Sequence, residues 1–260
     1  MTGTIHFVAD AGIATVTLES PGKLNAVNVV MWQELRRVFE ALAGDDGVRC
    51  IVVRGAGGNF AAGADLDEFG EVHHDVASGR RFHLEAVVPS LAAIRDVRQP
   101  VLAAVEGVCA GGGLQIALAC DIRIAADNAR FGVPVGRLGL PVVLPELRLL
   151  LERLGPTVTA ELLLTGRLLD AKEAREKGIV SRSVPAADFE QRVSETAHAM
   201  AAGSPLAASR NKAQIRLLLE RGMDYTAHEL DASFEFLDSE DYREGIAAFI
   251  AKRHPNFTGK

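Results

Sequence analysis

The sequence predicts an α/β protein with a layered core and a helical C-terminal region. Strand-like, loop and helix-like segments alternate through roughly the first two-thirds of the chain, which is typical of a sheet covered by helices. From Glu146 onward the chain is almost entirely helix-like, so we expect helices packed on the core or on a neighbouring subunit. Breaks in this last third fall at Gly155-Pro156, Gly166, Pro185 and Ser204-Pro205.

The first unit begins with two short strand-like runs. Residues 5–9 and 13–18 flank Asp10-Ala11-Gly12, as in a hairpin. A helix is expected over 29–43, where apolar residues recur at helical spacing. The compact apolar run 50–53 predicts a buried strand, and the glycine-rich turn 55–58 follows it.

A second unit repeats this plan. A helix is expected over 81–97, ending before Pro100. A strand over 101–105 leads through a glycine-rich segment into a helix over 114–119, and 122–126 predicts another strand.

Composition and charge restrict the class of protein. The chain has 260 residues and a formal net charge of −6, which argues against nonspecific nucleic-acid binding because such binding needs a basic surface. A local lysine could still hold an anionic ligand. The N-terminus lacks the pattern of a signal peptide, and no apolar run is long enough to span a membrane, so we expect a soluble protein.

The three cysteines, Cys50, Cys109 and Cys120, lie in apolar surroundings. An odd number without paired spacing indicates buried free thiols in a reducing compartment, so we expect a cytoplasmic protein. No His/Cys cluster has zinc-ligand spacing, and no metal site is expected. The adjacent His73 and His74 are expected in a solvated loop.

Two segments of small residues are the informative ones. Residues 60–66 follow a strand and precede a short helix-like stretch, and 111–115 open another helix after a strand. Helix N-termini carry free N–H groups, and small residues let a ligand approach them. Two such turns facing one point would stabilise an oxygen that becomes negatively charged, such as a thioester carbonyl. The alternative is that each is only a tight turn beside a packed helix. Neither segment matches a nucleotide-binding motif.

Together these segments resemble the crotonase superfamily, also called the enoyl-CoA hydratase/isomerase family. The resemblance extends over nearly the whole chain, and its landmarks occur in the family's order. They are SPGKLNA at 20–26, FAAGADL at 60–66, GVCAGGG at 107–113, ACDIR at 119–123, LLTG at 163–166, AKEA at 171–174, GIV at 178–180, and EGIAAF at 244–249 followed by Lys252 and Arg253.

The resemblance implies a crotonase-like spiral of ββα units over 1–195 and a C-terminal helical trimerisation region over 196–260. It implies a homotrimer or a dimer of trimers that binds an acyl-CoA thioester, with coenzyme A entering as part of the substrate and no separate cofactor. The family's oxyanion amides fall on Ala64 and Gly112. The residues implied for binding the CoA ester are Lys23, Leu24, Ala26, Ala62, Asp65, Leu66 and Val135, with Phe249 and Lys252 reaching a neighbouring subunit's CoA.

Both catalytic glutamates of the family's hydratases are absent under this resemblance. Their places hold Gln115 and Val135. An amide exchanges protons poorly near neutral pH and a valine cannot exchange them at all, so ordinary hydration is in doubt. Related isomerases place an acid at Val135 or at Val143, so isomerisation is in doubt as well.

Other residues could replace the missing acids. Glu146 could be an acid in the pocket, or a first-turn residue that complements the dipole of its helix. Arg137 could bind a carboxylate or form a structural pair. His83 lies on the helix between the two small-residue segments, a region that under the resemblance lines the acyl pocket. It could belong to that pocket, but a surface position is favoured. Asp121 is expected as a buried aspartate that accepts backbone hydrogen bonds.

Three functions remain open from the sequence. The first is an enzyme of the enoyl-CoA hydratase/isomerase type that stabilises a thioester enolate, with decarboxylation or thioester hydrolysis as other reactions of that class. The second is a catalytically silent acyl-CoA binding protein. The third, an oligomeric scaffold, is disfavoured because both small-residue segments are present.

Overall fold

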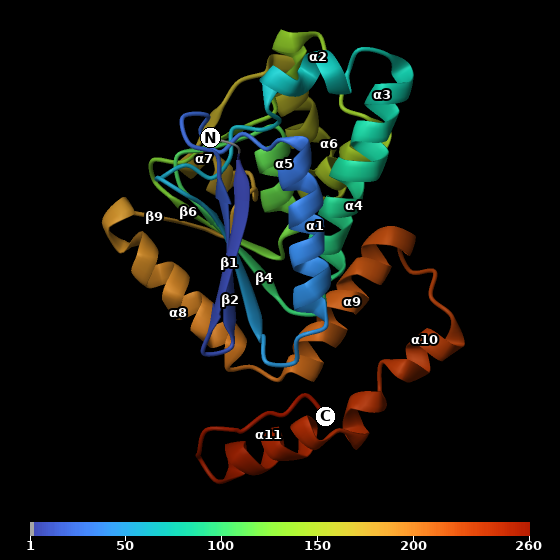
Figure 1. Cartoon of the computed structure of the whole chain (residues 1–260). Helices are drawn as coiled ribbons and strands as arrows, with labels where there is room; N and C mark the ends of the chain where they lie inside the picture. The colour runs from blue at the N-terminus through green and yellow to red at the C-terminus, as the bar shows by residue number, and fades with distance from the viewer. Residues whose placement is uncertain (1–2) are drawn as a thin grey trace.

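The computed structural model describes residues 3–260 (Figure 1). Its larger sheet has six strands in the order β1-β2-β3-β4-β6-β9. β1 pairs antiparallel with β2, and the other neighbouring pairs are parallel. The strands are β1 (Thr4–Asp10), β2 (Ile13–Glu19), β3 (Cys50–Gly55), β4 (Val101–Val105), β6 (Ile122–Ala126) and β9 (Arg182–Val184).

A smaller sheet of three strands lies beside the first, in the order β5 (Val108–Ala110), β7 (Arg130–Gly132) and β8 (Leu169–Asp170). The expectation of helices throughout the last third is wrong at β8 and β9. These strands have two and three residues, which is too short for an alternating pattern to show. The spiral α/β fold predicted from the sequence is confirmed.

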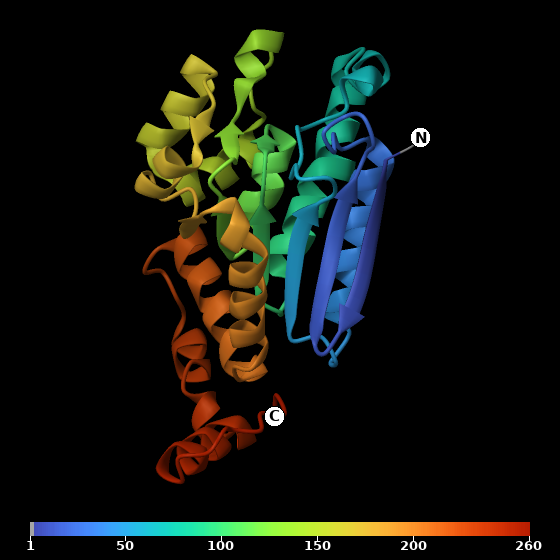
Figure 2. The ribbon, with the colours of Figure 1, turned by 90° about the vertical axis from the view of Figure 1, so that its left-hand side faces the viewer.

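Helices cover both faces of the larger sheet, as Figures 1 and 2 show. Successive residues of β3 point to opposite faces: Ile51 and Val53 join the cluster that includes α1, whereas Cys50 and Val52 join the one that includes α8. This two-sided burial explains why β3 is apolar throughout rather than alternating. The core helices are α1 (Val29–Ala43), α4 (Val88–Asp96), α5 (Gly112–Ala119), α6 (Leu144–Thr165), α7 (Ala171–Glu176) and α8 (Phe189–Ala201).

The helix expected over 81–97 differs from the prediction. It begins earlier, as α3 (Val76–Arg81) after the short α2 (Phe69–Val72), and then continues as a π-helix, η2 (Phe82–Val87), before α4. Pro89 lacks an N–H and cannot donate to the carbonyl of Glu85, so a regular α-helix would be interrupted there. The π-helix therefore lies just before Pro89, a residue whose effect helical periodicity does not show.

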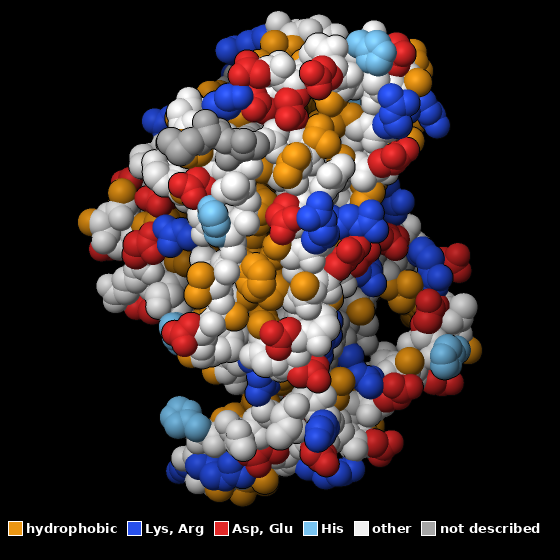
Figure 3. All heavy atoms as spheres, viewed as in Figure 1, with side chains coloured by type: hydrophobic (Ala, Val, Ile, Leu, Met, Phe, Trp, Pro, Cys, Tyr) orange, Lys and Arg blue, Asp and Glu red, His pale blue; other side chains and the backbone are white. Residues whose placement is uncertain are grey.

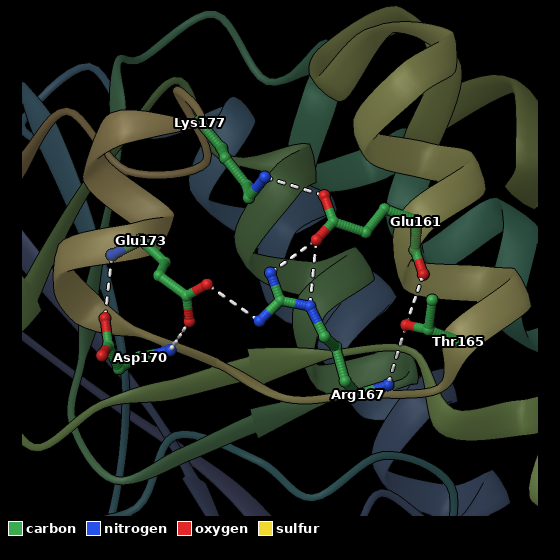
Figure 4. A network of polar contacts seen from close by, with 6 residues as sticks. All are labelled: Glu161, Thr165, Arg167, Asp170, Glu173 and Lys177. Atoms are coloured by element: carbon green, nitrogen blue, oxygen red, sulfur yellow. Dashed lines mark hydrogen bonds and ion pairs between the residues drawn. The ribbon is translucent and has the colours of Figure 1, made fainter.

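A polar network joins the end of α6 to α7 (Figure 4). Arg167 contacts Glu161 of α6 at 2.9 Å and Glu173 of α7 at 2.8 Å, and Lys177 contacts Glu161 at 2.8 Å. Gly166 ends α6 in the left-handed conformation at φ 60°, which favours glycine. The predicted break at this residue is confirmed.

The C-terminal region consists of α9 (Pro205–Arg221), α10 (Ala227–Ala232) and α11 (Glu240–Ile250). α10 and α11 extend away from the sheet (Figures 1 and 2). The last residues fold back, because Asp241 accepts hydrogen bonds from the N–H groups of Thr258 at 2.8 Å and Gly259 at 3.0 Å. The predicted boundary at residue 195 falls inside α8, and the division into two regions remains a prediction.

The three cysteines are buried free thiols, as predicted. Burial raises the pKa of Cys50 and of Cys120 to about 12, so both stay protonated near neutral pH. Within residues 3–260, no helix has both the length and the apolar character that crossing a bilayer requires.

Candidate functional site

The two small-residue turns predicted from the sequence lie against each other. Residue Ala61 forms a parallel bridge with Cys109, accepts a hydrogen bond from Ala110 N at 3.0 Å and donates one to Val108 O at 2.9 Å. A Cβ on Gly113 would lie 2.2 Å from the carbonyl oxygen of Ala61, so only glycine permits this approach. The backbone contact therefore fixes where the first turn of α5 sits relative to 60–66.

The N–H groups of Ala64 and Gly112 occupy the point where the turns meet. A Cβ built on Gly112 would be 3.8 Å from Ala64 N, and one built on Gly63 would be 3.5 Å from Gly112 N. Neither N–H has an acceptor among the residues that the structure describes. The structure thus brings together the two amides that were selected from the sequence.

Positive φ angles at two glycines produce this geometry. Gly63 has φ 112°, and Gly111, the N-cap of α5, has φ 50° and ψ −122°. These values are rarely adopted by residues with side chains. On the other side of the turn, the buried Trp32 ring would lie 3.0 Å from a Cβ on Gly112, so the indole closes one wall of the turn.

The loop 20–27 completes the same corner of the molecule. Asn25 donates to the carbonyls of Ala56 at 2.8 Å and Asn59 at 2.7 Å, and accepts from Ser20 N at 3.1 Å. Ala62 N donates to Leu24 O at 2.9 Å. The two segments predicted to bind CoA, 23–26 and 62–66, are therefore adjacent.

Side chains of these two segments differ in exposure. Leu24 and Leu66 are half exposed, whereas Ala26 and Asp65 are buried. Lys23 contacts Asp65 and Asp67, each at 2.7 Å. Hydrogen bonds to these carboxylates raise the pKa of Lys23, so its ammonium stays charged.

A buried polar cluster adjoins the start of α5. Gln115 is three residues after Gly112, on the same side of the helix, and its Nε2 donates to Oε2 of Glu146 at 2.9 Å. The other carboxylate oxygen, Oε1, lies 2.6 Å from Nδ1 of His83. Glu146 is in the first turn of α6 and 6% exposed, so its carboxylate is held inside the protein by specific partners.

The histidine predictions are partly wrong. His83 was expected at the surface, but its side chain is 21% exposed and contacts Glu146. His73 was expected in a solvated loop, but it ends α2 and its Nε2 lies 3.0 Å from Nε2 of His83. His74 is exposed, as predicted. In the sequence, Pro89 could have indicated the position of His83, because this proline marks the helix distortion that places the His83 side chain.

Other predicted residues lie elsewhere. Val135 is partly buried on the 3₁₀-helix η3 (Pro134–Leu138), packed against the main core, and Arg137 of the same segment is exposed. Phe249 is 84% exposed on α11, and Lys252 follows that helix at φ 53°; in the single chain both are remote from the turns. Lysine and arginine side chains gather over α11 at the lower end of Figure 3.

Asp121 accepts a hydrogen bond from Val101 N at 2.7 Å, as predicted, but its side chain is 24% exposed rather than buried, and it also pairs with Lys212 at 2.8 Å. This pair lines a cavity of about 380 Å³ between α4, α6, α8 and α9, away from the predicted site residues. Burial lowers the pKa of Lys212, although Asp121 opposes that effect. No group of three or more potential metal ligands occurs within 3–260.

The chain is similar to proteins of one family along nearly its whole length. The family model described as enoyl-CoA hydratase/isomerase matches residues 8–260. A probable enoyl-CoA hydratase of Mycobacterium bovis is 36% identical over 259 residues, covering 98% of each chain. A 2,3-dehydroadipyl-CoA hydratase of Escherichia coli is 33% identical, covering 95% of this chain and 96% of the relative.

A solved structure shows the same fold. The crystal structure of an enoyl-CoA hydratase/carnithine racemase from Magnetospirillum magneticum superimposes with a TM-score of 0.96 at 39% identity, covering 100% of this chain and 97% of that one.

Proposed function

The chain belongs to the enoyl-CoA hydratase/isomerase family, the crotonase superfamily, and we propose that it binds an acyl-CoA thioester and stabilises the thioester enolate with Ala64 and Gly112. The observation that carries this proposal is the pair of N–H groups, close together and without acceptors among the described residues. Both lie on rigid backbone, so they need little rearrangement to bind an oxyanion. One such donor is worth about 100- to 1000-fold in rate.

Glu146 is the proposed acid/base. Gln115 takes the place of one family glutamate and cannot exchange protons readily, but it binds the carboxylate of Glu146 at 2.9 Å. An ionised Glu146 would remove a proton from Cα of the thioester, and the electron pair of that C–H bond would move into the enolate oxygen. In isomerisation, protonated Glu146 would return this proton to Cγ of the dienolate. In hydration, Glu146 would instead take a proton from the water that adds to Cβ and deliver it to Cα of the resulting enolate.

CoA binding is proposed for the loop corner. The segments 23–26 and 62–66 would contact the CoA portion, with Lys23 exchanging its exposed carboxylate partner Asp67 for a phosphate. In a homotrimer or a dimer of trimers, Phe249 and Lys252 would reach the CoA bound by a neighbouring copy. Their exposure in the single chain supports this arrangement.

A catalytically silent acyl-CoA binding protein is the second candidate. The favouring observation is that both oxygens of Glu146 already have hydrogen-bond partners, so the carboxylate could be a structural bridge between α5 and the π-helix. Decarboxylation or thioester hydrolysis would use the same amides with a different substrate.

Three measurements separate these functions. Exchange of the Cα protons of butyryl-CoA in D₂O, followed by NMR, reports enolate formation, and loss of crotonyl-CoA absorbance reports hydration. Calorimetry with butyryl-CoA reports binding. We expect binding with exchange, whereas binding without exchange or hydration would favour the silent protein over the hydratase or isomerase.

Two variants assign the roles. Gly112→Pro removes one donor and should reduce exchange by about 100-fold or more. Proline is tolerated at the first helical position, but its Cβ would also lie 3.0 Å from the Trp32 ring, so Gly112→Ala, which adds a Cβ and keeps the N–H, is the control. Circular dichroism checks that both Gly112 variants fold. Glu146→Gln keeps the shape and should reduce exchange by about 100- to 10,000-fold while butyryl-CoA still binds. Exchange at the unchanged rate in both variants would contradict the proposal.

A further inference from the structure

A continuous line of polar contacts leads away from the candidate acid/base. Gln115 Nε2 contacts Glu146 Oε2 at 2.9 Å, Glu146 Oε1 contacts His83 Nδ1 at 2.6 Å, and His83 Nε2 contacts His73 Nε2 at 3.0 Å. These residues come from α5, α6, the π-helix and the end of α2. Neither histidine belongs to the landmarks that identify the family.

We propose that His83 is a positioning residue that orients the Glu146 carboxylate for proton transfer, and that His73 fixes the tautomer of His83. This inference rests on the proposed function, because Glu146 must be the group that exchanges the proton. His83 acts through Glu146 and is not itself proposed to contact the substrate.

The donor and acceptor capacities of the four groups determine the protonation pattern. An ionised carboxylate only accepts hydrogen bonds, so Gln115 and His83 must both donate to Glu146. His83 therefore carries its proton on Nδ1 toward Glu146. If His83 is neutral, its Nε2 is an acceptor and must receive the Nε2–H of His73.

His73 has the properties that this pattern needs. Burial, followed by the nearby His83, lowers the pKa of His73, so it is neutral near pH 7. Its Nδ1 is buried with no partner among the described residues. With the proton on Nε2, Nδ1 is only an unused acceptor, whereas the other tautomer would bury an unpaired N–H, the rarer situation in folded proteins.

The backbone supports a dedicated role for His83. The N–H of Val88 donates to the carbonyl of His83, five residues earlier, as in a π-helix. Such single-turn distortions are frequent at functional sites because they re-aim one side chain. Here the distortion places the His83 ring against Glu146, with Phe82 packed edge-on beside it at a centroid distance of 5.1 Å.

Removing His83 should change the hydrogen bonding and the geometry of Glu146. The carboxylate would keep only Gln115 as a partner and could rotate. Among the residues that the structure describes, the titratable groups along this line of contacts are His83 and, behind it, His73, since Gln115 is uncharged. Because the lost hydrogen bond is made to the carboxylate that exchanges the proton, the rate and its dependence on pH should both change.

The test compares two replacements of His83 with a matched control. In His83→Leu, the exchange of butyryl-CoA Cα protons in D₂O should have kcat reduced by about 10- to 100-fold, little change in KM and an altered pH–rate profile. His83→Asn keeps an N–H donor near the place of Nδ1 and should recover most of the rate. His74→Leu alters the exposed neighbour of His73 and should leave rate and profile unchanged.

A second readout examines the resting protein. Long-range ¹H–¹⁵N NMR of the imidazoles should show His83 with the proton on Nδ1 and His73 with it on Nε2. Glu146→Gln should change the His83 nitrogen shifts and leave those of His74 in place. The opposite His83 tautomer in the unchanged protein would overturn the assignment of roles.

The outcomes distinguish failure of the positioning role of His83 from failure of the proposed function. Full activity and an unchanged pH profile in His83→Leu would overturn the positioning role while leaving the proposed function intact. Equal losses in His83→Leu and His83→Asn, with both variants folded, would also overturn it because the donor would not matter. No exchange by the unchanged protein would overturn the proposed function, and the positioning role with it.

Discussion

Two regions of the molecule differ in the interactions that hold them in place. One is the corner where the two small-residue turns meet, and the other is the C-terminal region. At the corner, backbones touch directly, and Ala61, Leu114 and Gln115 are buried. In the C-terminal region, α9 and α10 have no fully buried residue, and α11 has only Asp241 and Ala248. Large apolar side chains there stay open to solvent in the single chain. Among them are Ile215, Leu218, Met223, Phe249 and Ile250.

The difference indicates that the two regions depend on different interactions. Close packing leaves no room for an added atom at Gly113, so the position of the two turns relative to each other is fixed within one chain. The C-terminal region is held by helix caps and by polar contacts such as those of Asp241. Exposed apolar surface of this kind suits burial against another copy, which is the proposed use of this region.

The largest expected effect is at the corner. Gly113→Val would place Cβ 2.2 Å from the carbonyl oxygen of Ala61, a backbone atom that cannot move aside. We expect a loss of at least about 3 kcal/mol in the free energy of unfolding, measured by urea denaturation. Gly70→Ala in α2, where no atom lies within 4 Å of the added Cβ, is the control and should be neutral or slightly stabilising. Similar stabilities for the two variants would contradict the close-packing argument.

A smaller effect is expected where the C-terminal tail is tied down. Asp241→Ala removes the acceptor for Thr258, Gly259 and Ser204, and should cost about 1–3 kcal/mol. Burial alone would raise the pKa of Asp241, but Ser204 and the backbone N–H groups outweigh it and lower that pKa. The stabilisation is therefore present above the unfolded pKa of about 3.9 and lost as pH falls through the folded pKa. Urea denaturation from pH 6 to about pH 3 measures this stabilisation, and Asp238→Ala, at an exposed position, is the control. Equal stabilities of the two variants would contradict the role of Asp241 in holding the C-terminal residues.

The pH dependence of stability near neutrality should come from His73, at the end of α2, rather than from the C-terminal region. His73 has a lowered pKa in the folded chain, so the unfolded chain binds its proton first as pH falls. Stability should decrease below about pH 6.5, by under about 1 kcal/mol because His73 is only partly buried and solvent screens its charge. Thermal melts of His73→Gln should show a flatter pH dependence than those of His74→Gln. If both variants keep the original slope, another group is responsible.

The smallest effect on the single chain is expected on α11. Phe249 is 84% exposed, so Phe249→Ser should change the stability of an isolated copy by less than about 0.5 kcal/mol. If this surface packs on a second copy, the same variant should weaken the assembly, measured by light scattering across protein concentrations. If the assembly is unchanged, Phe249 does not make the proposed contact with a second copy.

The sequence predicted the regular elements of the core well, and the reason is visible in particular segments. Strand 101–105 and helix 29–43 match β4 and α1, because long apolar runs and helical periodicity are strong local signals. The turns at Gly63 and Gly111 could be recognised as candidate sites from their small residues. The family resemblance favoured that interpretation over two ordinary tight turns.

The positions of His83 and His73 could not be predicted by the same means. A contact between His83 and Glu146 joins residues 63 positions apart, and it depends on one extra backbone residue per turn in the π-helix. Periodicity cannot show such a shift, although Pro89 was a usable clue. Likewise, β8 and β9 form through pairing with distant strands, and local propensity does not reveal that pairing.

The π-helix also has a consequence for how sequences of this type can be compared. Deleting one residue from 84–87 would restore ordinary α-helical hydrogen bonding, and every preceding side chain would turn by about 100° around the helix axis. His83 would then point away from Glu146 although both residues remained in the chain. Two relatives with the same histidine and glutamate can therefore differ in whether those residues meet, and the spacing between them, not their presence alone, decides it.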